Sequence, residues 1–351
     1  MSAWGTPLLI LIFAGGAAAT WLAGMVLSKG TDALDVRLGL GEEFGGLVLL
    51  AIAGSLPELA ITVSAAAGGH LPLAAGNLIG GIAVQTMVLL ICDAVAGDRP
   101  LSFLVGALTP VLEGLLVIIV VCGVIMGSLL KESTAIGGVV SPASIAICVV
   151  WGVGLYVINR ARKDPRWNVT SPGSSPGRAH RRESIKNKPH PYADASTGRV
   201  ALIFGAACLV TLVAGVALEE SGDALASHYG VNGVIFGATI LATASALPEI
   251  SSGIAAVRLG DNALAMGDIF GGNAFQVCLF LLADLIAGKP VLPSAGNLNA
   301  WLAALGVALT AVYGFGVISR PNRCHARLGP DSLLALTVFA LGIAGLFVVP
   351  H

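Results

Sequence analysis

The segment Ala53-Gly-Ser-Leu-Pro-Glu58 recurs later in the chain as Ala244-Ser-Ala-Leu-Pro-Glu249. Each copy lies in an apolar stretch about as long as the ~20 residues that a helix needs to cross the hydrocarbon core of a bilayer. A carboxylate is costly at that depth, and an intramembrane glutamate therefore predicts a functional site. The two segments predict an integral membrane protein and mark where its site lies.

The likeness between the two regions continues without a gap, at the offset of 191 positions that separates Glu58 from Glu249. Gly76-Asn-Leu-Ile-Gly-Gly-Ile-Ala-Val-Gln85 matches Gly267-Asp-Ile-Phe-Gly-Gly-Asn-Ala-Phe-Gln276, and Asp93 and Asp284 follow in register near the ends of their apolar stretches. So many coincident glycines, prolines and polar residues indicate an internal duplication.

The composition agrees with a membrane location. Of the 351 residues, 56% are hydrophobic and 11% are charged, whereas soluble domains carry about 25% charged residues. The net charge of −1 provides no basic field for nucleic acid. We therefore expect the lipid bilayer and inorganic cations as partners, an unknown oligomeric state, and no nucleic acid. The six cysteines form no CxxC pair, so a soft-metal site is not expected.

Hydropathy predicts an all-α membrane protein with ten transmembrane helices. The apolar segments that are long enough are 7–27, 45–67, 72–96, 102–127, 138–158, 199–218, 231–257, 262–287, 298–318 and 331–349.

The distribution of Lys and Arg predicts the orientation. With both termini outside, all Lys and Arg except Lys131 and Lys289 fall on the cytoplasmic side, as the positive-inside rule requires. Segment 160–198 is rich in proline and basic residues, which indicates a cytoplasmic linker. The acidic residues after position 218, which are Glu219, Glu220 and Asp223, are expected in an external loop.

The linker divides the chain into a first five-helix repeat, 1–159, and a second, 199–351. Five spans separate the two motif copies, and because five is odd, equivalent helices run in opposite directions. This is the inverted-repeat plan of secondary transporters, whose substrate site lies near the midplane where the repeats meet.

The chemistry of the motif favours a hard cation. Pro57 and Pro248 remove backbone N–H donors just before the glutamates, which frees carbonyl oxygens in the preceding turns. No Lys or Arg lies inside a predicted span, whereas Glu113 and Asp268 add further acids. Two carboxylates with loosened carbonyls form an oxygen cage that suits Ca²⁺, unless protons neutralise the acids.

Neutral residues of the matching segments 76–85 and 267–276 can contribute to cation binding or to helix packing. Gln85 and Gln276 are oxygen donors that either complete the cage or make hydrogen bonds between helices. The pairs Gly76/Gly80 and Gly267/Gly271 are spaced for close helix packing. Glu113, which has no acidic mate in the second half, is a candidate proton-binding group.

These motifs resemble the alpha repeats of the cation/Ca²⁺ antiporter superfamily, the Na⁺/Ca²⁺ exchanger membrane-region family. The resemblance rests on Gly54-Ser-Leu-Pro-Glu58 and Ser245-Ala-Leu-Pro-Glu249 together with the glycine motifs that follow each of them. It implies that Glu58 and Glu249 are the central Ca²⁺ ligands. It further implies that backbone oxygens near Ala51 and Ala242 contribute to flanking cation sites.

The chain departs from the family pattern at several positions. Gly81 and Gly272 replace a serine, and Gly54 replaces a hydroxyl residue that Ser245 retains in the other half. Glutamine at 85 and 276 is reminiscent of the H⁺/Ca²⁺ exchanger branch. The expected metal ligands are Glu58, Glu249, Gln85, Gln276, Ser245, Gly54, Ala51 and Ala242, and the secondary candidates are Ser55, Asn77, Asp268, Asn273 and Glu113.

We expect a secondary-active antiporter that exchanges Ca²⁺ for Na⁺ or H⁺ by alternating access, with no cofactor and no enzymatic activity. The alternatives are a cation channel and an antiporter for Mg²⁺, Mn²⁺ or K⁺. A channel ring arises from oligomer symmetry, whereas here both copies lie in one chain. The coupling ion remains open between Na⁺ and H⁺.

Overall fold

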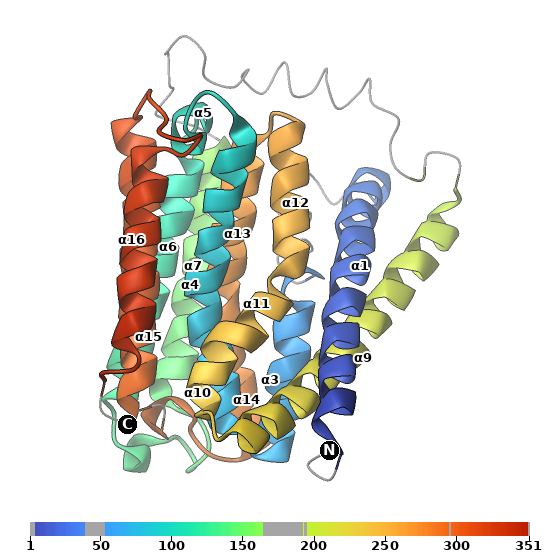
Figure 1. Ribbon diagram of the computed structural model, residues 1–351, viewed down its shortest axis with the longest axis vertical. Helices are drawn as coiled ribbons and strands as arrows, with labels where there is room; N and C mark the ends of the chain where they lie inside the picture. The colour runs from blue at the N-terminus through green and yellow to red at the C-terminus, as the bar shows by residue number, and fades with distance from the viewer. Residues whose placement is uncertain (1–3, 39–52, 164–191, 193–194, 295, 350–351) are drawn as a thin grey trace.

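The computed structural model describes residues 4–38, 53–163, 192, 195–294 and 296–349. In these ranges the regular secondary structure is helical (Figure 1). The first half contains α1 (Thr6–Leu38), α3 (Leu56–Gly68), α4 (Leu71–Ala96), α5 (Leu101–Leu104), α6 (Thr109–Ser128) and α7 (Pro142–Lys163). The second half contains α9 (Thr197–Tyr229), α10 (Gly233–Phe236), a π-helical segment (Gly237–Leu241), α11 (Ala242–Ser245), α12 (Leu247–Arg258), α13 (Asn262–Gln276), α14 (Leu279–Ala287), α15 (Gly296–Ser319) and α16 (Pro330–Gly345).

Seven of these helical stretches are long and apolar enough to cross a membrane. An eighth span is formed if the segment from α10 to α11 and the following α12, which meet at a bend of 45°, are counted together. Two shorter apolar helices are α3 and α16. Part of the predicted segment 45–67 lies outside the described residues, because the description resumes at residue 53.

The directions of the helices agree with an inverted arrangement. Both ends of the chain lie at one end of the bundle, which we call the terminal side (Figure 1). Helix α7 ends and α9 begins at the opposite end, the linker side. Helix α4 starts on the terminal side and its counterpart α13 starts on the linker side, so the two matching motifs run antiparallel.

Two helices are longer than the sequence predicts. Helix α9 continues to Tyr229, so Glu219, Glu220 and Asp223 lie within the helix and the predicted acidic loop is wrong. Glu219 is fully buried. Helix α7 continues to Lys163, four residues into the segment expected to be linker. In both cases polar partners from other helices, described below, compensate the charges that hydropathy places outside a span.

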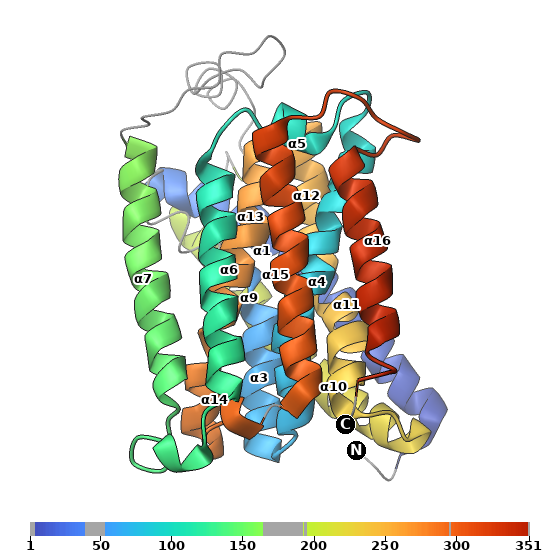
Figure 2. The ribbon, with the colours of Figure 1, turned by 90° about the vertical axis from the view of Figure 1, so that its left-hand side faces the viewer.

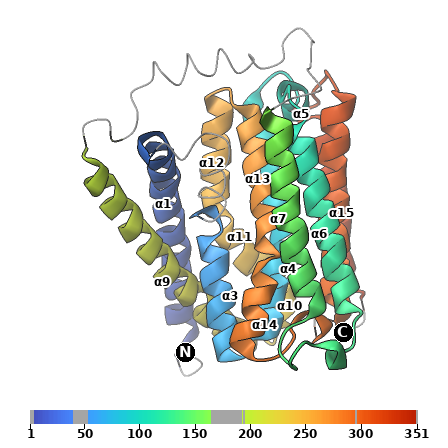
Figure 3. The same ribbon diagram turned by 180° about the vertical axis from the view of Figure 1, so that it is seen from behind.

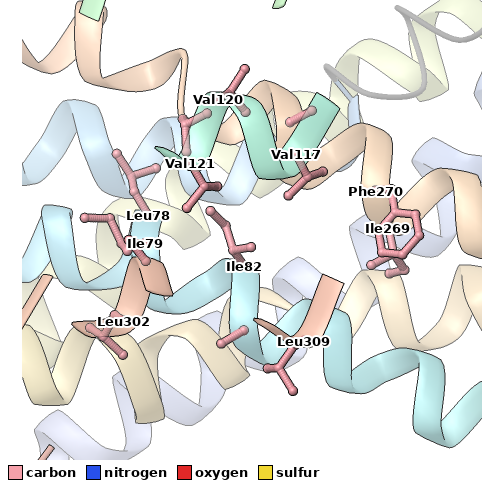
Figure 4. Packing of buried hydrophobic residues seen from close by; sticks show 14 of the residues in the cluster. Leu78, Ile79, Ile82, Val117, Val120, Val121, Ile269, Phe270, Leu302 and Leu309 are labelled. Atoms are coloured by element: carbon pink, nitrogen blue, oxygen red, sulfur yellow. The ribbon is translucent and has the colours of Figure 1, made fainter. Parts of the chain in front are cut away.

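The main core surrounds α4. Its residues Leu78, Ile79 and Ile82 pack against side chains from three other helices (Figure 4), namely Val117, Val120 and Val121 of α6, Ile269 and Phe270 of α13, and Leu302 and Leu309 of α15. Helices α1 and α9 pack along each other and stand beside this core (Figures 2 and 3). They reach it through α12 and α3, the helices that carry the glutamates.

The glycine motifs do not pack equally in the two halves. A Cβ at Gly80 of α4 would lie 2.4 Å from the Cα of Ala238, and one at Gly76 would lie 2.4 Å from the carbonyl oxygen of Val234. Helix α4 therefore touches the backbone of the π-helical region directly. At Gly271, the counterpart of Gly80, a Cβ would meet nothing within 4 Å. The prediction of close helix packing is confirmed for Gly76 and Gly80, and it is wrong for Gly271.

Replacing Gly80 by alanine is expected to destabilise the protein by about 1–3 kcal/mol, because backbone atoms of Ala238 cannot move aside as a flexible side chain would. The matched substitution Gly271→Ala is expected to change stability little. Thermal unfolding of the purified protein in detergent measures both. Equal shifts in the two variants would contradict the asymmetry.

Candidate functional site

The two Pro-Glu turns bring their carboxylates together in the interior. Pro57 and Pro248 occupy the first turns of α3 and α12, where a missing N–H costs no helical hydrogen bond. The helices thus start immediately before Glu58 and Glu249. Glu249 lies close enough to Glu58 for direct electrostatic repulsion. The two residues that the sequence analysis ranked first, from opposite halves, therefore meet.

Two neutral groups contact the Glu58 carboxylate, which is fully buried. The Gln85 amide donates from Nε2 to Oε1 of Glu58 over 3.0 Å. The Ser245 hydroxyl also hydrogen-bonds this carboxylate, and it lies 3.2 Å from the carbonyl oxygen of Ala242. Together with Glu249, these contacts compose the site from α3 and α4 of the first half and α11 and α12 of the second.

One oxygen of each glutamate has no hydrogen-bond partner, although it is buried. These atoms are Oε2 of Glu58 and Oε2 of Glu249. Among the described residues, no group of three or more His, Cys, Asp or Glu side chains is arranged to hold a metal ion. A cation here would therefore need neutral oxygens as well as the two carboxylates. Otherwise protons must neutralise the pair, because burying unpaired charge is expensive.

A cavity adjoins the carboxylates on the linker side. It lies between α1, the two Pro-Glu turns and the residues of α12 that follow Glu249. This part of α12 runs toward the linker side (Figure 1). Its walls come from both halves of the chain and consist of Gly24, Leu27, Ser28, Ala53, Gly54, Ser55, Pro57, Gln85, Thr211, Pro248, Glu249, Ser252, Asp268 and Gly272. The predicted residues Gly54, Ser55 and Asp268 are thus part of one site.

Asp268 extends the acidic region into this cavity. The Ser252 hydroxyl donates to its Oδ2 over 2.9 Å, and Asp268 lies close enough to Glu249 for direct repulsion. Its counterpart Asn77 is fully buried, and neither atom of its side-chain amide has a hydrogen-bond partner. The acidic extension therefore exists in one half only.

The two glutamines make different contacts. Gln85 contacts Glu58, whereas Nε2 of Gln276 donates to the backbone oxygens of Leu78 at 2.9 Å and Asn77 at 3.3 Å. The glycine at position 81 makes room for Gln276, because a Cβ there would lie 2.5 Å from Nε2 of Gln276. The interpretation of Gln276 as a link between helices, which the sequence left open, therefore agrees with its contacts.

The remaining candidates lie around the site. The Asn273 amide donates to Oγ1 of Thr86 at 3.2 Å and ties α13 to α4. Ala242 is fully buried one turn before Ser245. Ala51 lies outside the described residues.

Glu113 is paired with a basic residue, contrary to expectation. Nη2 of Arg162, in the last turn of α7, donates to Oε1 of Glu113. Hydropathy placed Arg162 in the linker, but the extended α7 brings it to α6. The prediction of a purely acidic interior is therefore wrong at this position.

Asp93 and Asp284 anchor loops. Asp93 accepts hydrogen bonds from the backbone amides of Leu101 and Gly329, each at 2.6 Å. Asp284 accepts from the amides of Val291 at 2.7 Å and Ser141 at 3.0 Å. Both are near helix ends, as predicted, and both bind backbone from elsewhere in the chain.

Two glycines next to the site were not predicted from the sequence. Gly24 of α1 abuts Pro248, since a Cβ would lie 2.5 Å from the proline Cβ. Gly215 of α9 abuts α3 in the same way, with the Pro57 carbonyl oxygen 3.1 Å from such a Cβ. These positions are related by the offset that relates Glu58 to Glu249. Extending the repeat comparison into the first span of each half would have found them.

Comparisons with known proteins agree with this arrangement. A family model described as sodium/calcium exchanger protein matches residues 8–159 and 199–348. The inner membrane protein YrbG of Escherichia coli (strain K12) is 27% identical over 255 residues, which are 72% of this chain and 70% of YrbG. The putative antiporter CaxA of Alkalimonas amylolytica is 26% identical over 297 residues, 84% of this chain and 86% of CaxA.

A similar fold occurs in a solved structure. The crystal structure of the H⁺/Ca²⁺ exchanger CAX aligns with a TM-score of 0.69 at 14% sequence identity, covering 98% of this chain and 82% of that chain. At this identity the likeness shows the shared fold.

Substituting Glu58 by glutamine is expected to raise the unfolding temperature when no divalent cation is present, because it removes repulsion between the carboxylates of Glu58 and Glu249. Wild-type protein should gain about 2.7 kcal/mol from Ca²⁺ at ~100 times its Kd, and the variant should gain little. Calorimetry with and without Ca²⁺ measures both effects. Glu132→Gln, at an exposed position in the short 3-10 helix between α6 and α7, is the control and should keep the full Ca²⁺ response.

Proposed function

The chain belongs to the sodium/calcium exchanger protein family, and on that premise we propose that it is a secondary-active antiporter that exchanges Ca²⁺ for Na⁺ or H⁺ across a membrane. The observation that carries this proposal is the meeting of Glu58 and Glu249 from opposite halves, each with a buried oxygen that has no partner. A site shared by two inverted halves can be exposed first to one side and then to the other.

In the proposed site, the two carboxylates bind the transported Ca²⁺. Their charge of −2 matches the dication, and Ca²⁺ takes 6–8 oxygen ligands, so neutral oxygens must contribute. The Gln85 amide and the Ser245 hydroxyl lie next to Glu58, and the Ala242 carbonyl oxygen lies 3.2 Å from that hydroxyl. Glu58, Glu249 and Gln85 therefore hold the ion, while Gln276 connects α13 to α4.

Exchange follows from competition for the same two carboxylates. Ca²⁺ requires both to be ionised, whereas protons or Na⁺ neutralise them, so the two states exclude each other. The glycines at 54 and 272 line the cavity without side-chain oxygens. Fewer oxygens are then available for a separate Na⁺, which supports H⁺ as the counter-ion.

We further propose ten spans in two inverted repeats, 1–159 and 199–351, with both termini outside and segment 160–198 in the cytoplasm. The antiparallel course of α4 and α13 supports the inversion (Figure 1). Helices α1 and α9 lie beside the core and meet the glutamate helices at Gly24 and Gly215. Because glycine has no side chain, these contacts suit two helices that slide over the core during alternating access.

The two glutamines provide a matched test of the ligand assignment. Gln85→Leu is expected to weaken Ca²⁺ binding by about 10–100-fold, the usual cost of losing a group that orients a metal-binding carboxylate. Gln276→Leu is expected to lower stability and leave Ca²⁺ affinity nearly unchanged. Isothermal titration calorimetry gives both affinities, and equal losses would refute the assignment.

Transport of ⁴⁵Ca²⁺ into proteoliposomes tests the function itself. Uptake is expected to respond to an imposed pH or Na⁺ gradient, and Glu58→Gln and Glu249→Gln should reduce it to background while Glu132→Gln should not. Uptake that ignores both gradients would contradict coupled exchange. Flux that persists in Glu58→Gln with altered ion selectivity would indicate a channel, and competition by Mg²⁺, Mn²⁺ or K⁺ would identify another preferred cation.

A further inference from the structure

One face of α9 carries a polar contact that the proposed transport site does not use. Gly215, Glu219 and Asp223 follow each other at intervals of four residues, so they line one stripe of the helix. Gly215 lies against α3 beside Glu58, as described above. Helix α9 runs toward the terminal side (Figure 1). Glu219 and Asp223 follow Gly215 in that direction and contact α3 and the turn that joins it to α4.

Three side-chain contacts hold this stripe in place. Ser64 Oγ donates to Oε2 of Glu219 over 2.6 Å. Nδ1 of His70 lies 2.8 Å from Oε1 of Glu219, and Nε2 of His70 lies 3.5 Å from Oδ2 of Asp223. Glu219 is fully buried, whereas about a third of the His70 side chain is exposed. The buried Glu219 carboxylate holds α9 against α3 and the α3–α4 turn as long as Ser64 and His70 compensate its charge. Loss of either partner would leave a costly buried charge.

The opposite half lacks this contact. By the repeat offset, the counterpart of Glu219 is Ser28 of α1, and the counterparts of Ser64 and His70 are Ala255 and Asp261. Ser28 lines the linker-side cavity. On the terminal side of Glu58, by contrast, Ile61, Thr62 and Ala65 are completely buried. The cavity and the polar contact thus lie on opposite sides of the glutamate pair.

We propose that Ser64, His70, Glu219 and Asp223 form a latch that ties α9 to the α3–α4 turn, holds the terminal side closed, and loosens when His70 loses its proton. The role in transport rests on the proposed function, because α9 must leave this turn for that side to open. The latch itself is a property of the fold.

The charges around His70 determine the direction of the effect. The acidic groups that act on it are Glu219, Asp223 and Glu220, all from α9. Lys289 lines a separate pocket with Gly69 and Leu71 beside the same turn. Partial burial alone would lower the pKa of His70, but the hydrogen bond to Glu219 and the neighbouring carboxylates outweigh it, and the pKa is raised.

The sign of the pH dependence follows from this shift. A raised pKa means that the latched state binds the proton more tightly than the open state. The latch is therefore fully formed below the ordinary histidine pKa of about 6.5, and it weakens as the pH rises through the raised value.

Hydrogen–deuterium exchange of the full-length protein tests the latch without relying on transport. At pH 6, His70→Gln is expected to speed exchange in peptides covering 59–75 by about tenfold, the scale of one charge-assisted hydrogen bond. At pH 9 the variant and wild type should be nearly equal. Glu219→Gln should likewise abolish the pH-dependent difference. His228→Gln is the control, since His228 lies on the same helix and contacts Thr6 at 3.4 Å instead.

A transport measurement completes the test. Self-exchange of ⁴⁵Ca²⁺ for Ca²⁺ at equal pH on both sides should be faster in His70→Gln than in wild type at pH 6, and the two rates should converge at pH 9. Identical hydrogen exchange in wild type and His70→Gln at both pH values would overturn the latch. Ca²⁺ self-exchange could be absent in every variant while the difference in hydrogen–deuterium exchange between wild type and His70→Gln persists. In that case the latch stands and the proposed function fails.

Discussion

Two carboxylates of like charge, the buried Glu58 and the partly buried Glu249, lie close enough to repel each other, and most of the structure follows from holding them there. In a low-dielectric interior each unpaired charge costs several kcal/mol. The pair is therefore stable only with a bound cation or with protons. Prolines start both glutamate helices at the required place, and Gln85 and Ser245 orient one of the carboxylates. In the proposed function, this need for positive charge is what suits the pair to bind a transported cation.

The two halves are related in sequence but differ in detail, and the differences have physical consequences. Gly80 packs tightly against Ala238 while Gly271 has open space around it. Gln85 donates a hydrogen bond to the Glu58 carboxylate, while Gln276 donates to the backbone of α4. A perfectly symmetrical protein would have equal free energies for its two outward and inward forms. With asymmetric contacts these free energies differ, and here the cavity beside the glutamates lies on the linker side while the polar contact of α9 lies on the terminal side.

The sequence predicted the helical class, the opposite directions of α4 and α13 and the proximity of the two glutamates, and it erred where a charge has a distant partner. Glu219 was assigned to a loop because a lone carboxylate is costly inside a span, but Ser64 and His70 compensate it. Arg162 was assigned to the linker for the same reason, yet it pairs with Glu113. Local hydropathy counts the cost of each charge but cannot include a partner from elsewhere in the chain. The partners of Glu219 are more than a hundred residues away, and the partner of Arg162 lies in another helix.

The duplicated Pro-Glu motif and the apolar stretches around it were enough to predict an integral membrane protein in which two glutamates from related segments lie close together. Periodicity, the positions of proline and the constant offset are local properties that any chain with this sequence carries. Tertiary structure alone decided which neutral groups contact the glutamates, which glycines touch backbone, and where the polar contact of α9 lies. Those outcomes depend on how helices are rotated and shifted against one another, and that is set by the packing of many side chains together.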